Sequence, residues 1–251
     1  MGHPPVRLPR RDHRPAAERR HADGPGAALG SALATLHTRD STALRCGQAV
    51  AAVQGTDRVE SVRLADGTVI DADLVVVGIG AVPRTDWLDG SGLPLDNGVV
   101  CDEFLRAGAP GLYAAGDVAR WHNLLFDRSM RVEHWFAAAE RGARAGRNAV
   151  SPADARSYST VPYFWSDWYG SRIQFAGVAT NDGYELVSGD LAGDHFVALY
   201  REGDRLTGML TLNGQRHVMK YRRLIAQRAR FDEAIAFART SAPTRSATTT
   251  S

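Results

Sequence analysis

This chain of 251 residues contains only two cysteines and no long hydrophobic run. Cys46 and Cys101 lie far apart and no C-x-x-C pair occurs, which argues against a disulfide framework and against a dithiol redox couple. No apolar stretch is long enough to cross a membrane, and no apolar core of a signal peptide follows Met1. We therefore expect a cytoplasmic protein without a membrane partner.

The sequence also lacks a large excess of either charge, with 30 Lys and Arg residues against 28 Asp and Glu residues and a net charge of +2. This near balance gives no support for bulk nucleic-acid binding. Residues 1–25 differ, because they are rich in arginine, histidine and proline and show no apolar periodicity, so we predict that they are disordered. A basic arm for nucleic acid and the product of a shifted reading frame are two alternative interpretations of this segment. Residues 240–251 are predicted to form a disordered tail.

The part of the chain after residue 25 begins with alternating helix and apolar strand patterns, which are typical of α/β folds. Apolar residues recur at helical spacing and predict a helix from about residue 26 to Arg39. Asp66-Gly67 predicts the tight turn of a small antiparallel hairpin. The wholly apolar segments Leu74–Val77 and Leu112–Ala115 are typical of parallel strands buried on both faces. Further strands are predicted at residues 43–46, 49–53 and 59–64, and an Ala- and Gly-rich helix at residues 133–148.

After Pro152 the pattern changes to strands followed by helices, which predicts a separate α+β unit. Gly203-Asp204 marks the turn between the last two strands. The expected strands cover residues 173–178, 184–188, 195–201 and 205–212, and the expected helices cover residues 216–227 and 231–237.

Three short motifs contain residues suited to a cofactor site. Gly116-Asp117 follows an apolar strand, so its carboxylate lies at the sheet edge where α/β proteins bind ligands and can accept hydrogen bonds from sugar hydroxyls. Glu133-His134-Trp135 opens a helix, whose free N–H groups and positive dipole end suit an electron-rich group. Trp165 lies in the dense aromatic cluster of residues 162–170, which suits stacking on a flat ring.

Each motif also has a purely structural interpretation. Asp117 alone is also compatible with a capping residue in a turn. Taken alone, Glu133 is better explained as a favourable charge in the first turn of a helix, and the aromatic cluster as core filling at a domain junction. Two glycine-rich segments fail as dinucleotide loops. Residues 24–30 follow no strand, and Gly78-Ile79-Gly80 is followed by Pro83 and lacks the third glycine.

Four segments, taken in order, resemble one family. They are ADLVVVGIGAVP at residues 72–83, LYAAGDVA at residues 112–119, RVEHW at residues 131–135 and PYFWSD at residues 162–167. This order resembles the FAD-dependent ferredoxin, rubredoxin and putidaredoxin reductases, a family of pyridine nucleotide-linked oxidoreductases, over nearly all of residues 26–237. Such enzymes carry two glycine-rich dinucleotide loops that have no counterpart here. The resemblance therefore implies the C-terminal portion of such a reductase, truncated at its N-terminus.

The resemblance implies an α/β remnant of the FAD- and NAD(P)-binding Rossmann-like domains, followed by an α+β C-terminal reductase domain. Residues 26–73 then correspond to the tail of the NAD(P)H-binding domain, residues 74–154 to the returning part of the FAD-binding domain, and residues 155–239 to the C-terminal domain. The strands that would neighbour Leu74–Val77 and Leu112–Ala115 are then missing, so we expect poor solubility of the isolated chain.

By resemblance, the function is that of an FAD-dependent NAD(P)H:ferredoxin oxidoreductase, which passes electrons from NAD(P)H through flavin to a [2Fe–2S] ferredoxin. The alternative is an inactive fragment that acts at most as a dimerisation or ferredoxin-docking module. No catalytic or metal-ligating side chain is implied, because the flavin carries the chemistry. The implied cofactor-binding residues are Gly116 and Asp117 at the ribityl chain, Glu133, His134 and Trp135 at the flavin ring, Trp165 beside the isoalloxazine, and Gly78, Gly80 and Pro83 near the nicotinamide nucleotide.

Overall fold

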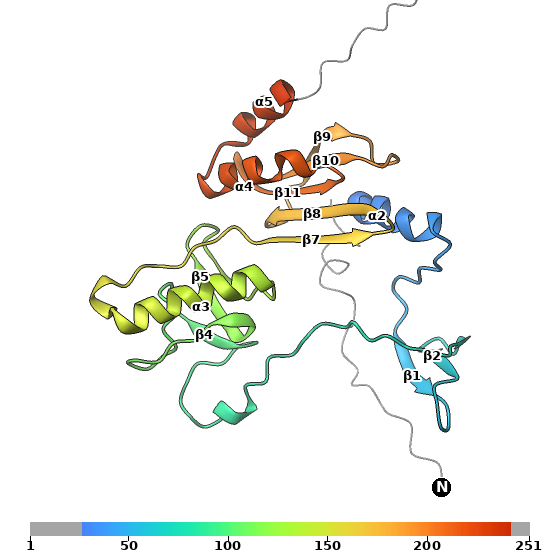
Figure 1. Ribbon diagram of the computed structural model, residues 1–251, viewed down its shortest axis with the longest axis horizontal. Coiled ribbons are helices and arrows are strands. Elements are labelled where there is room, and N and C mark those ends of the chain that lie inside the picture. The colour runs from blue at the N-terminus through green and yellow to red at the C-terminus, as the bar shows by residue number, and fades with distance from the viewer. Residues whose placement is uncertain (1–26, 242–251) are drawn as a thin grey trace, which may run out of the picture. The chain divides into compact units, whose positions relative to one another are not determined.

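A computed structural model describes residues 27–241 of the chain (Figure 1). These residues form two compact units, one that ends at Ala81 and one that begins at Val82, and each is described by itself. The predictions for residues 1–25 and 242–251 lie outside the described residues. Helix α5 includes Thr240 and Ser241, which the predicted disordered tail had included. None of the helices between residues 27 and 241 has the length and apolar character needed to cross a membrane.

The unit that ends at Ala81 contains a helix and a three-stranded antiparallel sheet in the order β1-β2-β3. The predicted Asp66-Gly67 turn is confirmed, because the Asp66 carboxylate accepts a hydrogen bond from the backbone N–H of Thr68 at 2.9 Å. The strand predicted at residues 43–46 is wrong, since this exposed segment pairs with no described strand. The elements are α2 (Ala27–Arg39), β1 (Val50–Gln54), β2 (Ser61–Leu64) and β3 (Val69–Asp71).

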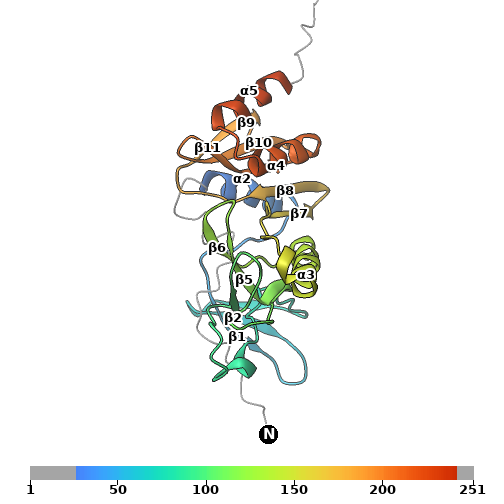
Figure 2. The same ribbon diagram turned by 90° about the vertical axis from the view of Figure 1, so that its left-hand side faces the viewer.

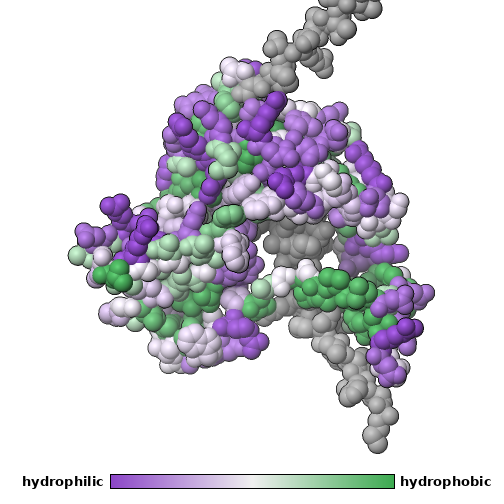
Figure 3. Space-filling view, in the orientation of Figure 1, coloured by the Kyte–Doolittle hydropathy of each residue, from purple (hydrophilic) through white to green (hydrophobic). Residues whose placement is uncertain are grey.

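The apolar segment after β3 does not form the buried strand predicted at Leu74–Val77. It pairs with no strand among the described residues, and the side chains of Leu74, Val76 and Val77 are 79%, 87% and 62% exposed. Figure 3 shows this segment as a band of hydrophobic surface. Its composition is that of a buried strand, but such a strand needs neighbours on both sides to pair with its backbone, and residues 27–241 provide none.

The unit that begins at Val82 contains a three-stranded sheet in the order β4-β5-β6, in which β4 and β5 are parallel. The strand predicted at Leu112–Ala115 is wrong, since this segment makes one isolated bridge, between Tyr113 and Arg106. As with the segment after β3, the described residues hold no strand that would pair along its length. Three strands were not predicted: β4 (Val99–Cys101), which is apolar but only three residues long, and the strands of mixed polarity β5 (Ala119–Asn123) and β6 (Arg128–Met130).

Helix α3 (Trp135–Val150) confirms the helix predicted at residues 133–148, displaced by two residues at each end. Its buried face packs on a core that includes Trp121 and Tyr158, whose ring centres lie 5.3 Å apart. The two small side chains of this face, Ala137 and Ala145, belong to that core. The buried residues follow the spacing of one helical face and are Ala137, Arg141, Ala145 and Asn148.

The C-terminal part of this unit is a five-stranded antiparallel sheet in the order β7-β8-β11-β10-β9 (Figure 2). Helices α4 and α5 cover one face, where Leu199 and Met209 of the sheet pack with Tyr221 and Ile225 of α4. The predicted α+β arrangement is confirmed, and β11 has the predicted bounds. The elements are β7 (Tyr163–Trp168), β8 (Ser171–Gly177), β9 (Tyr184–Gly189), β10 (Phe196–Glu202), β11 (Arg205–Leu212), α4 (Val218–Ala226) and α5 (Phe231–Ser241), with short helical turns η1 (Asp86–Leu88), η2 (Gly116–Val118), η3 (Pro152–Asp154) and η4 (Gln215–His217).

Candidate functional site

The Gly116-Asp117 motif forms the turn η2, which leads directly into strand β5. Gly116 adopts a φ of 72°, in the left-handed region that glycine enters without strain. The turn leaves the Asp117 side chain 59% exposed. This carboxylate is therefore available to accept hydrogen bonds from a bound molecule.

Helix α3 begins with an uncapped N-terminus. His134 occupies the N-cap position, but its side chain makes no capping hydrogen bond. The N–H groups of the first turn therefore lack a side-chain acceptor, and they coincide with the positive end of the helix dipole. Trp135 and Phe136 in this turn are 84% and 51% exposed. Such a helix end suits an electron-rich or negatively charged group.

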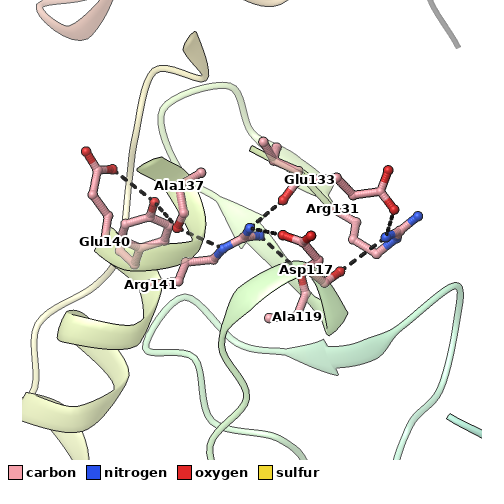
Figure 4. A network of polar contacts seen from close by, with 9 residues as sticks. Asp117, Ala119, Arg131, Glu133, Ala137, Glu140 and Arg141 are labelled. Atoms are coloured by element: carbon pink, nitrogen blue, oxygen red, sulfur yellow. Dashed lines mark hydrogen bonds and ion pairs between the residues drawn. The ribbon is translucent and has the colours of Figure 1, made fainter. Parts of the chain in front are cut away.

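Two arginines connect the η2 turn to the start of α3 (Figure 4). Nη1 of Arg131 donates a hydrogen bond to the backbone carbonyl of Asp117 at 3.1 Å and lies 2.5 Å from Oε1 of Glu133. Nη2 of the fully buried Arg141 lies 3.9 Å from Oδ1 of Asp117. Arg141 was not among the residues predicted from the sequence. The available signal was its position four residues after Ala137, on the face that the helix buries.

The aromatic cluster places Trp165 of β7 against the first turn of α3. Its ring centre lies 5.6 Å from that of Phe136 and 5.7 Å from that of Tyr163, and its side chain is 43% exposed. These three aromatic residues are among those that line a cleft of about 240 Å³. Phe164 lies next to Trp165 and packs on His134, with ring centres 5.3 Å apart. The start of α3 and strand β7 therefore present aromatic surface to one cleft.

His134 lies between these aromatic residues and the buried arginine. Burial lowers the pKa of His134 below its ordinary value, and the nearby charge of Arg141 lowers it further. The Nδ1 atom is buried and has no hydrogen-bond partner. A buried polar atom without a partner is uncommon in proteins, and a ligand at the helix start is one group that can satisfy it.

The remaining predicted residues are Gly78, Gly80 and Pro83. Gly78 and Gly80 lie in the unit that ends at Ala81, in the exposed segment after β3, and Pro83 lies at the start of the second unit. A side chain at either glycine would meet no other atom within 4 Å. Their role at a nicotinamide nucleotide stays a prediction. Within residues 27–241, no group of three His, Cys, Asp or Glu side chains is placed to hold a metal ion.

Family models match two regions of the chain. Residues 17–142 match the model described as pyridine nucleotide-disulphide oxidoreductase. The chain belongs to this family. Residues 163–247 match the model described as reductase C-terminal, which covers strand β7 and all the elements that follow it.

Several relatives of the chain are named as reductases. Putidaredoxin reductase CamA of Pseudomonas putida is 34% identical over 183 residues, which are 71% of this chain and 42% of that protein. The anthranilate 1,2-dioxygenase system ferredoxin–NAD(+) reductase component of Burkholderia cepacia is 33% identical over 199 residues, which are 79% of this chain and 45% of that protein. The crystal structure of the covalent putidaredoxin reductase–putidaredoxin complex has 30% identity and a TM-score of 0.72, over 80% of this chain and 48% of that chain.

These matches confirm the resemblance to ferredoxin and putidaredoxin reductases and the predicted fold class, a Rossmann-like α/β region followed by a C-terminal reductase domain. The chain spans about half the length of the relatives it matches. The family implies FAD and NAD(P)H as cofactors, and the site fits a flavin. It offers an exposed carboxylate at Asp117, an uncapped helix N-terminus, partly exposed aromatic rings and the unpartnered Nδ1 of His134.

Proposed function

We propose that this chain forms one side of the flavin site of an NAD(P)H:ferredoxin oxidoreductase, which passes electrons from NAD(P)H through FAD to a [2Fe–2S] ferredoxin. The observation that carries the proposal is that two separate segments adjoin the start of helix α3. Asp117 forms an ion pair with Arg141 of this helix, and the ring of Trp165 contacts the ring of Phe136 in its first turn. The three parts supply an acceptor for hydroxyl groups, a positive helix end and aromatic surface.

In this proposal the Asp117 carboxylate accepts hydrogen bonds from the ribityl hydroxyls, and Gly116 lets the backbone come close to the ligand. The N-terminus of α3, with Glu133, His134 and Trp135, would lie at the flavin ring, where the positive end of the helix dipole would stabilise negative charge. Trp165 supplies aromatic surface beside the ring and keeps water away. When bound, the flavin supplies the hydride-accepting and one-electron chemistry.

A second cleft supports an acidic electron acceptor as the partner. It has a volume of about 590 Å³, and Arg144, Arg222 and Arg223 of helices α3 and α4 are among its lining residues. Glu140 is the one carboxylate among these lining residues and lies 3.8 Å from Arg222. Arg222 also lines the cleft at Trp165, so the two clefts adjoin. An excess of positive charge steers an acidic protein toward this face.

We further propose that Gly78, Gly80 and Pro83 belong to the loop near the nicotinamide nucleotide, and that domain boundaries lie near residues 73 and 154. The resemblance of residues 72–83 to the reductase motif supports the first proposal. The boundary near residue 154 falls between the two family matches, because the first match ends at residue 142 and the second begins at residue 163.

Titration of the purified 251-residue chain with FAD, followed by flavin absorbance and fluorescence, tests the proposed site. We expect saturable binding by the wild type. Asp117→Ala and Trp165→Ala should each weaken it by about tenfold, since one removes a charged hydrogen-bond acceptor and the other removes aromatic surface. Asp154→Ala, at an exposed aspartate in η3, is the control and should bind as the wild type does. A wild-type chain without saturable FAD binding refutes the proposal.

The alternative function is an inactive fragment that docks ferredoxin or dimerises. One observation favours it. The arginine-lined cleft lies in the unit that begins at Val82, and none of the residues that line this cleft is a predicted dinucleotide-binding residue. A colourless chain that binds an acidic [2Fe–2S] ferredoxin, with an affinity that falls as salt rises and is lost in Arg222→Glu, supports this alternative. A chain that binds neither FAD nor ferredoxin rejects both functions.

A further inference from the structure

Arg141 is an unexpected charged residue on the buried face of α3. Its side chain is 0% exposed, although arginine is almost never fully buried unless it is paired. Its ion-pair partner Asp117 lies 3.9 Å away and is itself 59% exposed. One loose contact with a solvated carboxylate does not offset the burial of a guanidinium group, so other groups must stabilise the charge.

Three backbone carbonyl oxygens and an aromatic ring complete the surroundings of the guanidinium. Nε donates to the carbonyl of Ala137 at 3.1 Å, Nη1 donates to that of Ala119 at 3.3 Å, and Nη2 donates to that of Val132. The guanidinium carbon lies 4.9 Å from the ring centre of Trp121, which is fully buried. Each nitrogen of the planar group therefore has an acceptor, and the ring covers the group (Figure 4 shows the polar contacts).

The three carbonyls belong to the segments that build the proposed flavin site. Ala119 directly follows the turn that carries Asp117, Val132 directly precedes the Glu133-His134 entry to α3, and Ala137 lies in the first turns of that helix. Strands β5 and β6 separate the turn from the entry in the sequence, and the Arg141 side chain joins the two directly.

We propose that Arg141 is a positioning residue of the flavin site, which rests on the function proposed above. Its guanidinium group fixes the Asp117 turn and the N-terminus of α3 relative to each other. A lysine keeps the charge but has no planar fork to bind diverging carbonyls. A glutamine has one NH₂ group and no charge. Neither substitution restores all three bonds.

Hydrogen exchange of the 251-residue chain, measured by mass spectrometry without any cofactor, tests the positioning role. Arg141→Gln and Arg141→Lys should raise amide exchange in peptides that cover residues 116–120 and 131–138, and should leave β8 to β11 unchanged. Arg239→Gln removes an exposed arginine from α5 and should change neither region. Unchanged exchange at both site segments in Arg141→Gln, or an equal rise across the whole unit, overturns the proposal.

FAD binding separates this inference from the proposed function. Arg141→Gln should raise the FAD dissociation constant by about tenfold. At saturating FAD its visible circular dichroism should still differ from that of the wild type, because the ring sits in an altered site. Loss of stability alone would not change that spectrum. Wild-type affinity with a wild-type spectrum overturns the inference. If the wild type itself binds no FAD, the proposed function fails, and the exchange experiment still decides whether Arg141 positions the two segments.

Discussion

Gly98 lies directly before β4 and packs against the turn that carries Asp117. A Cβ atom at position 98 would lie 2.4 Å from the carbonyl oxygen of Val118 and 3.1 Å from Cδ of Arg131. The residue also has a φ of 125°, which residues with side chains rarely adopt. Because the Val118 oxygen belongs to the backbone, no side-chain rotation relieves the clash. Gly98→Ala must therefore displace the turn and, with it, Asp117.

We expect Gly98→Ala to lower the free energy of unfolding by about 3 kcal/mol. The backbone conformation contributes roughly 1–2 kcal/mol of this loss, and overpacking against Val118 contributes roughly another 1–3 kcal/mol. Gly111→Ala is the matched control, because Gly111 also has a positive φ, of 76°, but no atom lies within 4 Å of its Cβ position. The control should lose only the backbone part, about 1 kcal/mol.

Equilibrium unfolding in guanidinium chloride, followed by circular dichroism and tryptophan fluorescence, measures both losses. The fully buried Trp121 belongs to the core beside this turn and reports on its unfolding. FAD titration of the same proteins should show weaker binding for Gly98→Ala and unchanged binding for Gly111→Ala. Equal losses of stability in the two variants would refute the argument from the Val118 contact.

Three further predictions concern other parts of the chain. Val76→Asp should raise the soluble fraction in a sedimentation assay by charging the exposed apolar segment, whereas Val150→Asp, at a residue 81% exposed but outside that segment, should not. His134→Gln should flatten the pH dependence of stability. Burial lowers the pKa of His134 from its ordinary value of 6.5. The stability contributed by the neutral, buried histidine is therefore fully present above pH 6.5 and is lost as the pH falls through the lowered pKa. Parallel curves of unfolding free energy against pH for the wild type and the variant would contradict this. Burial raises the pKa of the Cys101 thiol to about 11. A thiol reagent should therefore label the exposed Cys46 first and Cys101 only after unfolding. Rapid labelling of both cysteines in the folded chain would contradict this prediction.

The sequence predicted the elements whose hydrogen bonds join neighbouring residues. Helix α2 and helix α3 lie within two residues of their expected bounds, because apolar spacing within a helix is a local signal. The hairpin of β2 and β3 and that of β10 and β11 were predicted from Asp66-Gly67 and Gly203-Asp204, since a tight turn fixes which strands pair.

The errors concern strands that depend on distant partners. Leu74–Val77 and Leu112–Ala115 have the composition of buried strands, but composition cannot state whether partner strands exist, and residues 27–241 hold none for them. Two segments that were not predicted as strands do pair in parallel: Val99–Cys101, which has only three residues, and Ala119–Asn123, which mixes polar and apolar residues. In both cases, whether a segment forms a strand depends on a partner strand elsewhere in the chain.

The candidate site shows the same limit at the level of side chains. The motifs predicted Asp117, Glu133 and Trp165 as separate residues. In the structure, helix α3 contacts Asp117 through Arg141 and Trp165 through Phe136, and Arg131 joins Glu133 to the backbone of Asp117. Arg141 was missed because a charged residue on a helix is usually solvated, and only the burial of its face distinguishes it.

Burial also divides the arginines of α3 and α4 into two kinds. Arg141 has no exposed surface and binds three backbone carbonyls, so salt cannot screen its contacts and its effect is confined to the geometry of the site. Arg144 and Arg222 line an accessible cleft, where their charge acts over distance and weakens as ionic strength rises. The proposals made above therefore assign one residue type to positioning in the core and to steering at the surface. The two roles separate experimentally, because only the second depends on salt.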